Sequence, residues 1–96
     1  MADRWISVKD RLPEELVPVI VVWVNRCPPS YYADIKDVPF SGTAVFYGGN
    51  WYWESPTCVD MLSEYGRYEF GLVDKQVDIT HWMPLPEPPK GEDDGA

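Results

Sequence analysis

The strongest structural signal in the sequence lies at residues 17–25, which read Val17-Pro18-Val19-Ile20-Val21-Val22-Trp23-Val24-Asn25. β-Branched residues dominate this run, and such side chains fit a pleated, packed surface. Apolar side chains fill both alternating sets of positions, which gives the strand two apolar faces. The pattern predicts a central strand covered on both sides, with Pro18 at its entry.

Further strands are predicted on both sides of this run. Residues 43–47 and 51–53 are aromatic and β-favouring, and Gly48-Gly49-Asn50 between them is typical of a hairpin turn. Residues 5–8 alternate apolar and polar side chains, which predicts a short edge strand. Residues 77–83 predict the last strand of the domain. Residues 68–73 suggest one more short strand.

The remaining segments predict one helix and several irregular stretches. Thr57 is the expected N-cap of a short helix that runs to Tyr65, with Gly66 as its C′ residue. Residues 26–42 are rich in Pro and lack periodicity, so we expect a long loop with about one turn of helix. Residues 84–89 are mostly Pro, which predicts a polyproline II strap. Residues 90–96 predict a disordered acidic tail.

Together these elements predict an α+β fold that is mostly β, in one globular domain over residues 1–89. We expect a small antiparallel sheet of three to five strands, one short helix and the C-terminal polyproline strap. The segments at about 26–42 and 55–76 are expected to be inserted loops.

Composition narrows the functional classes. The 96 residues include 8 basic and 16 acidic side chains, a formal net charge of -8 that counts against nucleic-acid binding. The longest apolar run, residues 16–24, is far shorter than the ~20 residues of a membrane span. No secretory signal is evident, and Cys27 and Cys58 are expected to be reduced thiols. These features favour a cytoplasmic protein with no membrane partner.

The aromatic content is the least ordinary feature, at 15% with five Trp. Within the expected hairpin, Trp51 and Trp53 point to one face of the sheet and Tyr52 to the other. The simplest interpretation is that bulky aromatics replace a larger aliphatic core. The alternative is exposed aromatics, which form either a subunit interface in a homo-oligomer or a stacking pocket.

A stacking pocket for a planar ligand such as a nucleobase would also need cations for its phosphates. Arginines supply bidentate contacts of this kind. His81, the only histidine, is either a strand residue near the N-terminal segment or a member of the site. The candidate ligand-binding residues are Trp5, Arg11, Arg26, Trp51, Trp53, Arg67, His81 and Trp82.

Catalytic and metal-binding patterns are weak. Cys27, Cys58 and His81 supply three zinc ligands at most, without the close spacing and fourth ligand of structural sites. Gly48-Gly49 belongs to a hairpin and not to a phosphate loop. No serine stands in a nucleophile-elbow context. We therefore predict no catalytic residues, no metal and no cofactor.

Two terminal motifs resemble a known family. Residues 5–14, Trp5-Ile6-Ser7-Val8-Lys9-Asp10-Arg11-Leu12-Pro13-Glu14, combine with residues 79–89, Ile79-Thr80-His81-Trp82-Met83-Pro84-Leu85-Pro86-Glu87-Pro88-Pro89. This combination resembles the phage- and prophage-encoded domain-of-unknown-function family numbered 551. The valine-rich strand and the aromatic hairpin between the motifs match it as well. The resemblance implies a phage or prophage origin and a small all-β or α+β domain, and it brings no catalytic residues.

These observations leave three functional hypotheses. The first is a non-catalytic binding protein, acting in the bacterial cytoplasm against a host defence, that sequesters a nucleotide-like small molecule in an aromatic and arginine cleft. The second is an acidic protein-interaction module that binds and inhibits a host protein. The third is a small enzyme that uses His81 with Asp10.

Overall fold

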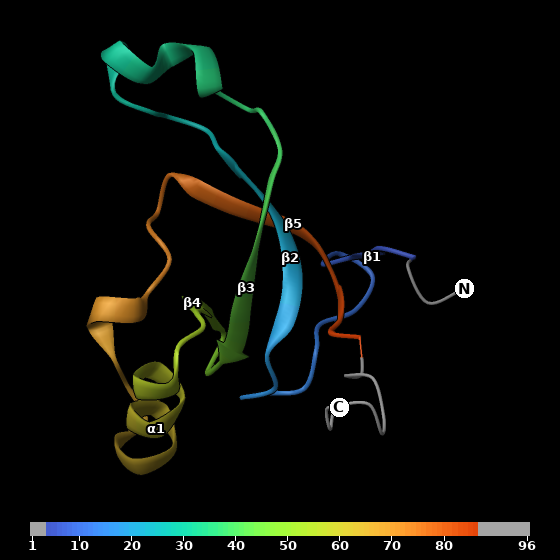
Figure 1. Ribbon diagram of the computed structural model, residues 1–96, viewed down its shortest axis with the longest axis vertical. Coiled ribbons are helices and arrows are strands. Elements are labelled where there is room, and N and C mark those ends of the chain that lie inside the picture. Colours follow the sequence, from blue (N-terminus) through green and yellow to red (C-terminus); the bar gives the residue numbers. More distant parts are fainter. Residues whose placement is uncertain (1–3, 87–96) are drawn as a thin grey trace, which may run out of the picture.

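Five antiparallel strands form a single sheet in the computed structural model, which describes residues 4–86 (Figure 1). The spatial order is β1-β5-β2-β3-β4. The strands are β1 (Ile6–Ser7), β2 (Val19–Asn25), β3 (Phe40–Tyr47), β4 (Asn50–Trp53) and β5 (Val77–Pro84). With one α-helix packed on the sheet, this is the predicted α+β, mostly β fold.

The valine-rich segment is the middle strand, as predicted. β2 pairs with β5 on one side and with β3 on the other. Val19 and Val21 are buried, and Ile20 and Val22 on the opposite face are half-buried. The register between β2 and β5 shifts at Val22/Trp23, which marks a β-bulge.

The hairpin of β3 and β4 has the predicted glycine turn. Gly48 and Gly49 have φ of 60° and 85°, a backbone region that side chains other than glycine rarely adopt. The start predicted for its first strand, Thr43, was wrong, because β3 begins at Phe40. Phe40 lies opposite Trp23, and the two rings stack with centroids 5.0 Å apart.

The two faces of the sheet carry different cores. On one, which we call the aromatic face, Trp23, Trp51 and Trp53 pack against a buried cluster. That cluster consists of Val19, Val21, Ala44, Ile79 and Trp82. On the other, the helix face, Val45 and Tyr52 are buried beneath Cys58 and Leu62 of the helix. Tyr52 therefore points away from Trp51 and Trp53, as the alternation predicted.

The helix α1 (Pro56–Tyr65) starts earlier than expected. Ser55, not Thr57, is the N-cap, and its Oγ accepts the Cys58 backbone N–H at 3.0 Å. The reason is Pro56, which favours the first helical position because it has no N–H to satisfy. Gly66 ends the helix with φ 78°, as predicted. Burial of Cys58, which faces the sheet from α1, raises the pKa of its thiol.

The strand predicted at residues 68–73 was wrong. This segment contains a short 3₁₀ helix, η2 (Glu69–Gly71), and only Leu72 makes a β-bridge, with Tyr52. Gly71 is buried so close to α1 that a Cβ there would lie 3.1 Å from the Cys58 sulfur. The chain passes the helix so closely that a larger residue would force Cys58 or Tyr68 to shift by a few tenths of an ångström, and this tertiary packing overrides the strand propensity of the neighbouring residues.

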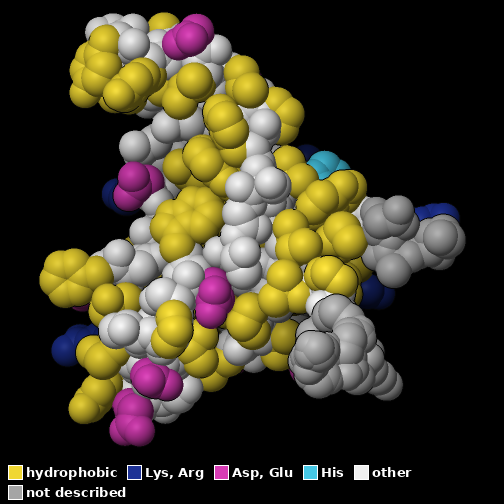
Figure 2. Space-filling view, in the orientation of Figure 1, with side chains coloured by type: hydrophobic (Ala, Val, Ile, Leu, Met, Phe, Trp, Pro, Cys, Tyr) yellow, Lys and Arg dark blue, Asp and Glu magenta, His cyan; other side chains and the backbone are white. Residues whose placement is uncertain are grey.

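Residues 26–39 project from the sheet as an arm that links β2 to β3 (Figure 1). Its outer end is η1 (Ser30–Ile35), a 3₁₀ segment with a kink at Tyr32. Hydrophobic side chains gather on this end, at the top of Figure 2. Tyr31 is 78% exposed and Tyr32 is 55% exposed. The predicted loop is thus shorter and more structured than expected.

The C-terminal strap is described only at its start. Pro84 continues β5 opposite Val19, so the last strand ends one residue later than predicted. Residues 87–89 of the strap and the tail at 90–96 lie outside the described residues.

Candidate functional site

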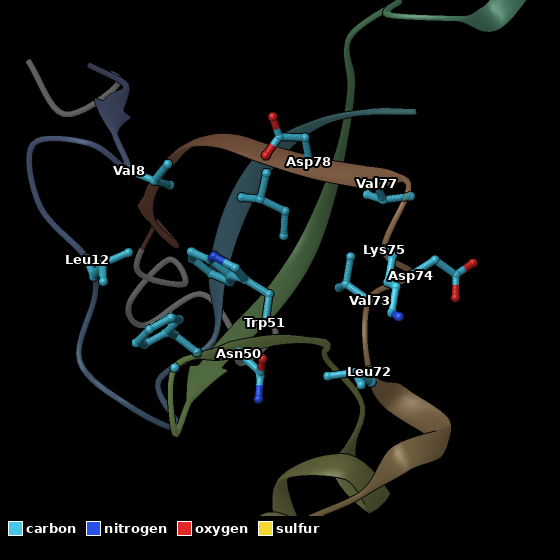
Figure 3. A pocket seen from close by; sticks show the side chains of 13 residues that line it. Val8, Leu12, Asn50, Trp51, Leu72, Val73, Asp74, Lys75, Val77 and Asp78 are labelled. Atoms are coloured by element: carbon cyan, nitrogen blue, oxygen red, sulfur yellow. The ribbon is translucent and has the colours of Figure 1, made fainter. Parts of the chain in front are cut away.

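An open groove of about 690 Å³ lies on the aromatic face (Figure 3). Trp51 of β4 extends into it, between Val8 and Leu12 of the N-terminal segment and Val73 of the segment before β5 (Figure 3). Its volume lies within the roughly 300–1,000 Å³ of typical small-molecule pockets. The groove therefore has an aromatic side chain at its centre and apolar walls on two sides.

The walls of this groove are held by backbone contacts. The Val73 N–H donates to the Trp51 carbonyl at 3.1 Å, and Leu72 bridges Tyr52. Phe46 meets the Trp51 ring edge-to-face at a centroid distance of 5.3 Å. These contacts fix the position of the Trp51 indole, which presents a flat apolar surface.

Polar groups line the end of the groove next to β5. Lys75 stands there with two carboxylates, Asp74 and Asp78, whereas Asn50 lies at the start of β4 with its amide directed away from Trp51 (Figure 3). Counted over these groups, the groove has one cation and two anions. An uncharged planar ligand suits it better than an anion does.

A second, smaller recess of about 270 Å³ adjoins the groove. The two hollows share Val8, Asp78 and Ile79 in their walls, so they meet at the β5 edge, where β1 ends. The recess adds five further residues, all of them polar: Ser7, Lys9, Arg26, Thr80 and His81.

The predicted aromatic residues fall into separate places. Trp51 lies in the groove, whereas Trp53 packs edge-to-face on Trp23 at 5.6 Å. Trp82 is buried and its indole N–H donates to the Arg11 carbonyl at 2.8 Å. Trp5, ahead of β1, is 41% exposed.

The predicted cations are also dispersed. The Arg11 guanidinium lies over the Trp82 ring, 5.7 Å from its centroid. Arg67 lies beyond α1, in a shallow hollow with Tyr68 and Phe70. The structure does not bring these two arginines to the groove with Trp51.

Arg26 holds the base of the arm. Its guanidinium donates to Asp37 at 3.1 Å and to Asp78 at 3.0 Å, and its backbone N–H donates to the Gln76 carbonyl at 2.7 Å. The hydrogen bonds from Arg26 and Lys36 lower the pKa of the Asp37 carboxyl, and those to Asp78 and Asp37 raise the pKa of Arg26. Of the predicted arginines, Arg26 alone reaches a wall of the recess.

His81 stands opposite Ser7 of β1, and its Nδ1 is 2.9 Å from the Thr80 hydroxyl. Its position in a strand beside the N-terminal segment fits the simpler of the two interpretations, and it also lines the recess. Asp10, the proposed partner in an enzyme, does not line that recess. Cys27 is exposed and Cys58 is buried, and both are free thiols.

Sequence reasoning missed Lys9, Asn50, Val73 and Lys75, all of which line the two hollows. Turns and connecting segments carry most of them, where no periodic pattern marks a residue as facing a cavity. Only the rule that binding residues favour loops could have pointed to them. Within residues 4–86, no group of three or more metal-ligating side chains occurs.

The fold and the two hollows define a small α+β domain with an aromatic groove on one face of its sheet. A family model described as "Protein of unknown function (DUF551)" matches residues 4–90, and the chain belongs to this family. No curated protein and no solved structure matches the chain. In the described part, no helix has the length and apolar character needed to cross a membrane.

Proposed function

We propose that this chain is a non-catalytic binding protein of phage or prophage type that sequesters a small nucleotide-like ligand in the groove around Trp51. The supporting observation is a fixed indole at the centre of an open, apolar hollow. Its place of action is the bacterial cytoplasm, where capture of a signalling nucleotide counters a host defence.

The base of the ligand stacks on Trp51 in this proposal. Stacking of a base on an aromatic side chain is worth about 1–3 kcal/mol. Leu12 and Val73 flank the indole and exclude water from the edges of the stacked base.

Tryptophan fluorescence tests this proposal by titration with cyclic and ADP-ribose-type nucleotides. Binding is expected to quench or shift the emission. Trp51→Leu is expected to weaken binding about 5- to 150-fold, the loss of one stacked base. Trp5→Leu is the matched control, because Trp5 lies outside the groove, and its affinity should equal that of the wild type.

Absence of any response to all of these nucleotides would contradict the proposal. Equal losses in Trp51→Leu and Trp5→Leu would also contradict it, since the groove would then have no special part in binding.

A second candidate is a protein-interaction module, which the arm supports. Tyr31 and Tyr32 are exposed at the end of an arm whose base is fixed by the ion pairs of Arg26. Exposed aromatics on a fixed element are typical of protein interfaces. The net charge of -8 favours a basic host protein as the partner over a second copy of this chain.

Native mass spectrometry of the protein purified from bacteria separates these candidates, since it reports retained small molecules, bound proteins and self-association together. The double substitution Tyr31→Ser and Tyr32→Ser should abolish a protein complex formed through the arm. It should leave nucleotide binding in the groove unchanged. A homo-oligomer that survives this substitution would place the subunit interface elsewhere.

A further inference from the structure

The recess beside the groove differs from the rest of the molecule in charge. Its walls hold two cations, Lys9 and Arg26, and one carboxylate, Asp78. The count is +1 in a chain whose formal net charge is -8. The groove next to it counts one lysine against two carboxylates. Asp37, outside these walls, also pairs with Arg26, so the recess differs from the groove in being less acidic.

We propose that this recess is an anion subsite that holds the phosphate of the ligand whose base stacks on Trp51, an inference that rests on the function proposed above. The two hollows share Val8, Asp78 and Ile79 in their walls and so lie next to each other along β5. The uncharged planar end of the ligand occupies the groove and its anionic end occupies the recess. The opposite orientation places the phosphate beside Asp74.

Hydrogen-bond donors are available in the recess. Within residues 4–86, Lys9 makes no salt bridge, which leaves its ammonium group for an anion. Arg26 uses one N–H on Asp37 and one on Asp78, and a guanidinium has five. Asp37 and Asp78 thus hold the guanidinium in place while its other N–H groups can contact a phosphate.

The hydroxyl and imidazole groups complete the recess. Ser7 supplies a hydroxyl, whereas the Thr80 hydroxyl donates to the Val22 carbonyl at 3.4 Å. The Nδ1 of His81 contacts that same Thr80 hydroxyl, which leaves Nε2 as the ring nitrogen for a ligand. The bulge in β5 next to Thr80 interrupts the regular ladder at this point. Bulges often re-aim side chains beside binding sites.

Isothermal titration calorimetry of adenosine and ADP tests the subsite on the wild type, Lys9→Gln and Lys75→Gln. The wild type should bind ADP more tightly than adenosine. Lys9→Gln should weaken ADP binding about fivefold, the upper range for an exposed charge pair, and leave adenosine binding unchanged. Lys75→Gln, the matched control in the groove, should not reduce the preference for ADP.

A second titration, with inorganic pyrophosphate, does not depend on stacking. Its readout is the change in the NMR resonances of the His81 ring. If adenosine binds but Lys9→Gln leaves ADP affinity intact, or Lys75→Gln weakens it instead, the anion subsite is overturned and the proposed function stands. If pyrophosphate shifts His81 in the wild type and not in Lys9→Gln, while adenosine fails to bind, the recess stands and the proposed function is overturned. If no ligand binds, both are overturned.

Discussion

The two faces of the sheet use their large side chains differently. On the helix face, Val45 and Tyr52 of the sheet are buried because α1 lies over them, and Cys58 and Leu62 of α1 are buried against the sheet. On the aromatic face, Trp23, Trp51 and Trp53 are only partly buried, and no helix covers them among residues 4–86. The difference indicates that the helix face serves stability. The aromatic face is the one that leaves large side chains accessible, and the proposed ligand site lies there.

The largest effect is expected on the helix face. Leu62→Ala removes a buried side chain, and the cavity it leaves should cost about 2–5 kcal/mol in the free energy of unfolding, measured by urea denaturation. Tyr65→Ala is the control, because Tyr65 lies in the same helix and is exposed. A cost for Leu62→Ala no greater than that for Tyr65→Ala would remove the distinction between the faces.

A smaller effect is expected at the start of the helix. Ser55→Ala removes the side chain that caps α1 and should cost about 1 kcal/mol. Thr57→Ala, at the cap position suggested by sequence alone, should change stability little. Chemical denaturation of both variants checks this, and the reverse ranking would mean that the helix begins at residue 58.

On the aromatic face, stability and binding should separate. Trp51→Leu keeps an apolar side chain at a half-buried position and should cost about 1 kcal/mol or less in stability. Trp51→Leu should lower the affinity for the nucleotide strongly. Leu62→Ala, compared at the same concentration of folded protein, should lower that affinity little. Parallel denaturation and binding measurements check this. If Trp51→Leu is as destabilised as Leu62→Ala and its folded form keeps the wild-type affinity for the nucleotide, Trp51 is a core residue like Leu62.

The smallest effect concerns the arm and its pH dependence. Ion pairing holds the pKa of Asp37 below its ordinary value of 3.8, so this carboxylate stabilises the arm above that pH. The stabilisation is lost as the pH falls through the lowered pKa. Exchange of the Asp37 amide, which donates to the Asn25 carbonyl, should therefore stay slow to about pH 4 and accelerate below it, relative to its intrinsic rate.

Asp37→Asn provides the control for this measurement. It should show faster amide exchange in the arm at neutral pH and no further step in acid. An arm that opens at the same pH in both proteins would show that the ion pairs of Arg26 do not hold it.

The sheet could be predicted because its signals are local. The continuous β-branched apolar run in residues 17–25 and the glycines at 48 and 49 specify a middle strand and a hairpin without further information. The two terminal motifs behind the family resemblance also proved to be neighbours, since Ile6 pairs with Trp82. The strand predicted at 68–73 was wrong, because the close passage of Gly71 over Cys58 depends on tertiary packing.

The candidate site was less predictable than the sheet. Trp51 was identified, but Lys9 and Lys75 come from connecting segments whose position depends on β1 and on the backbone bond between Val73 and Trp51. Arginines were expected near the aromatics. Instead Arg11 lies on Trp82 and Arg26 holds the arm, roles that depend on contacts between residues distant in sequence.

The central claim is that a ligand stacks on Trp51 in the open groove. The indole N–H resonances of the five Trp residues test it most directly in a ¹H–¹⁵N NMR titration with ADP. The Trp51 signal should shift most, and that of Trp82, which is buried and hydrogen-bonded to the Arg11 carbonyl, should stay nearly constant. If ADP leaves the Trp51 signal unchanged, or shifts only that of Trp5, the groove is not the binding site.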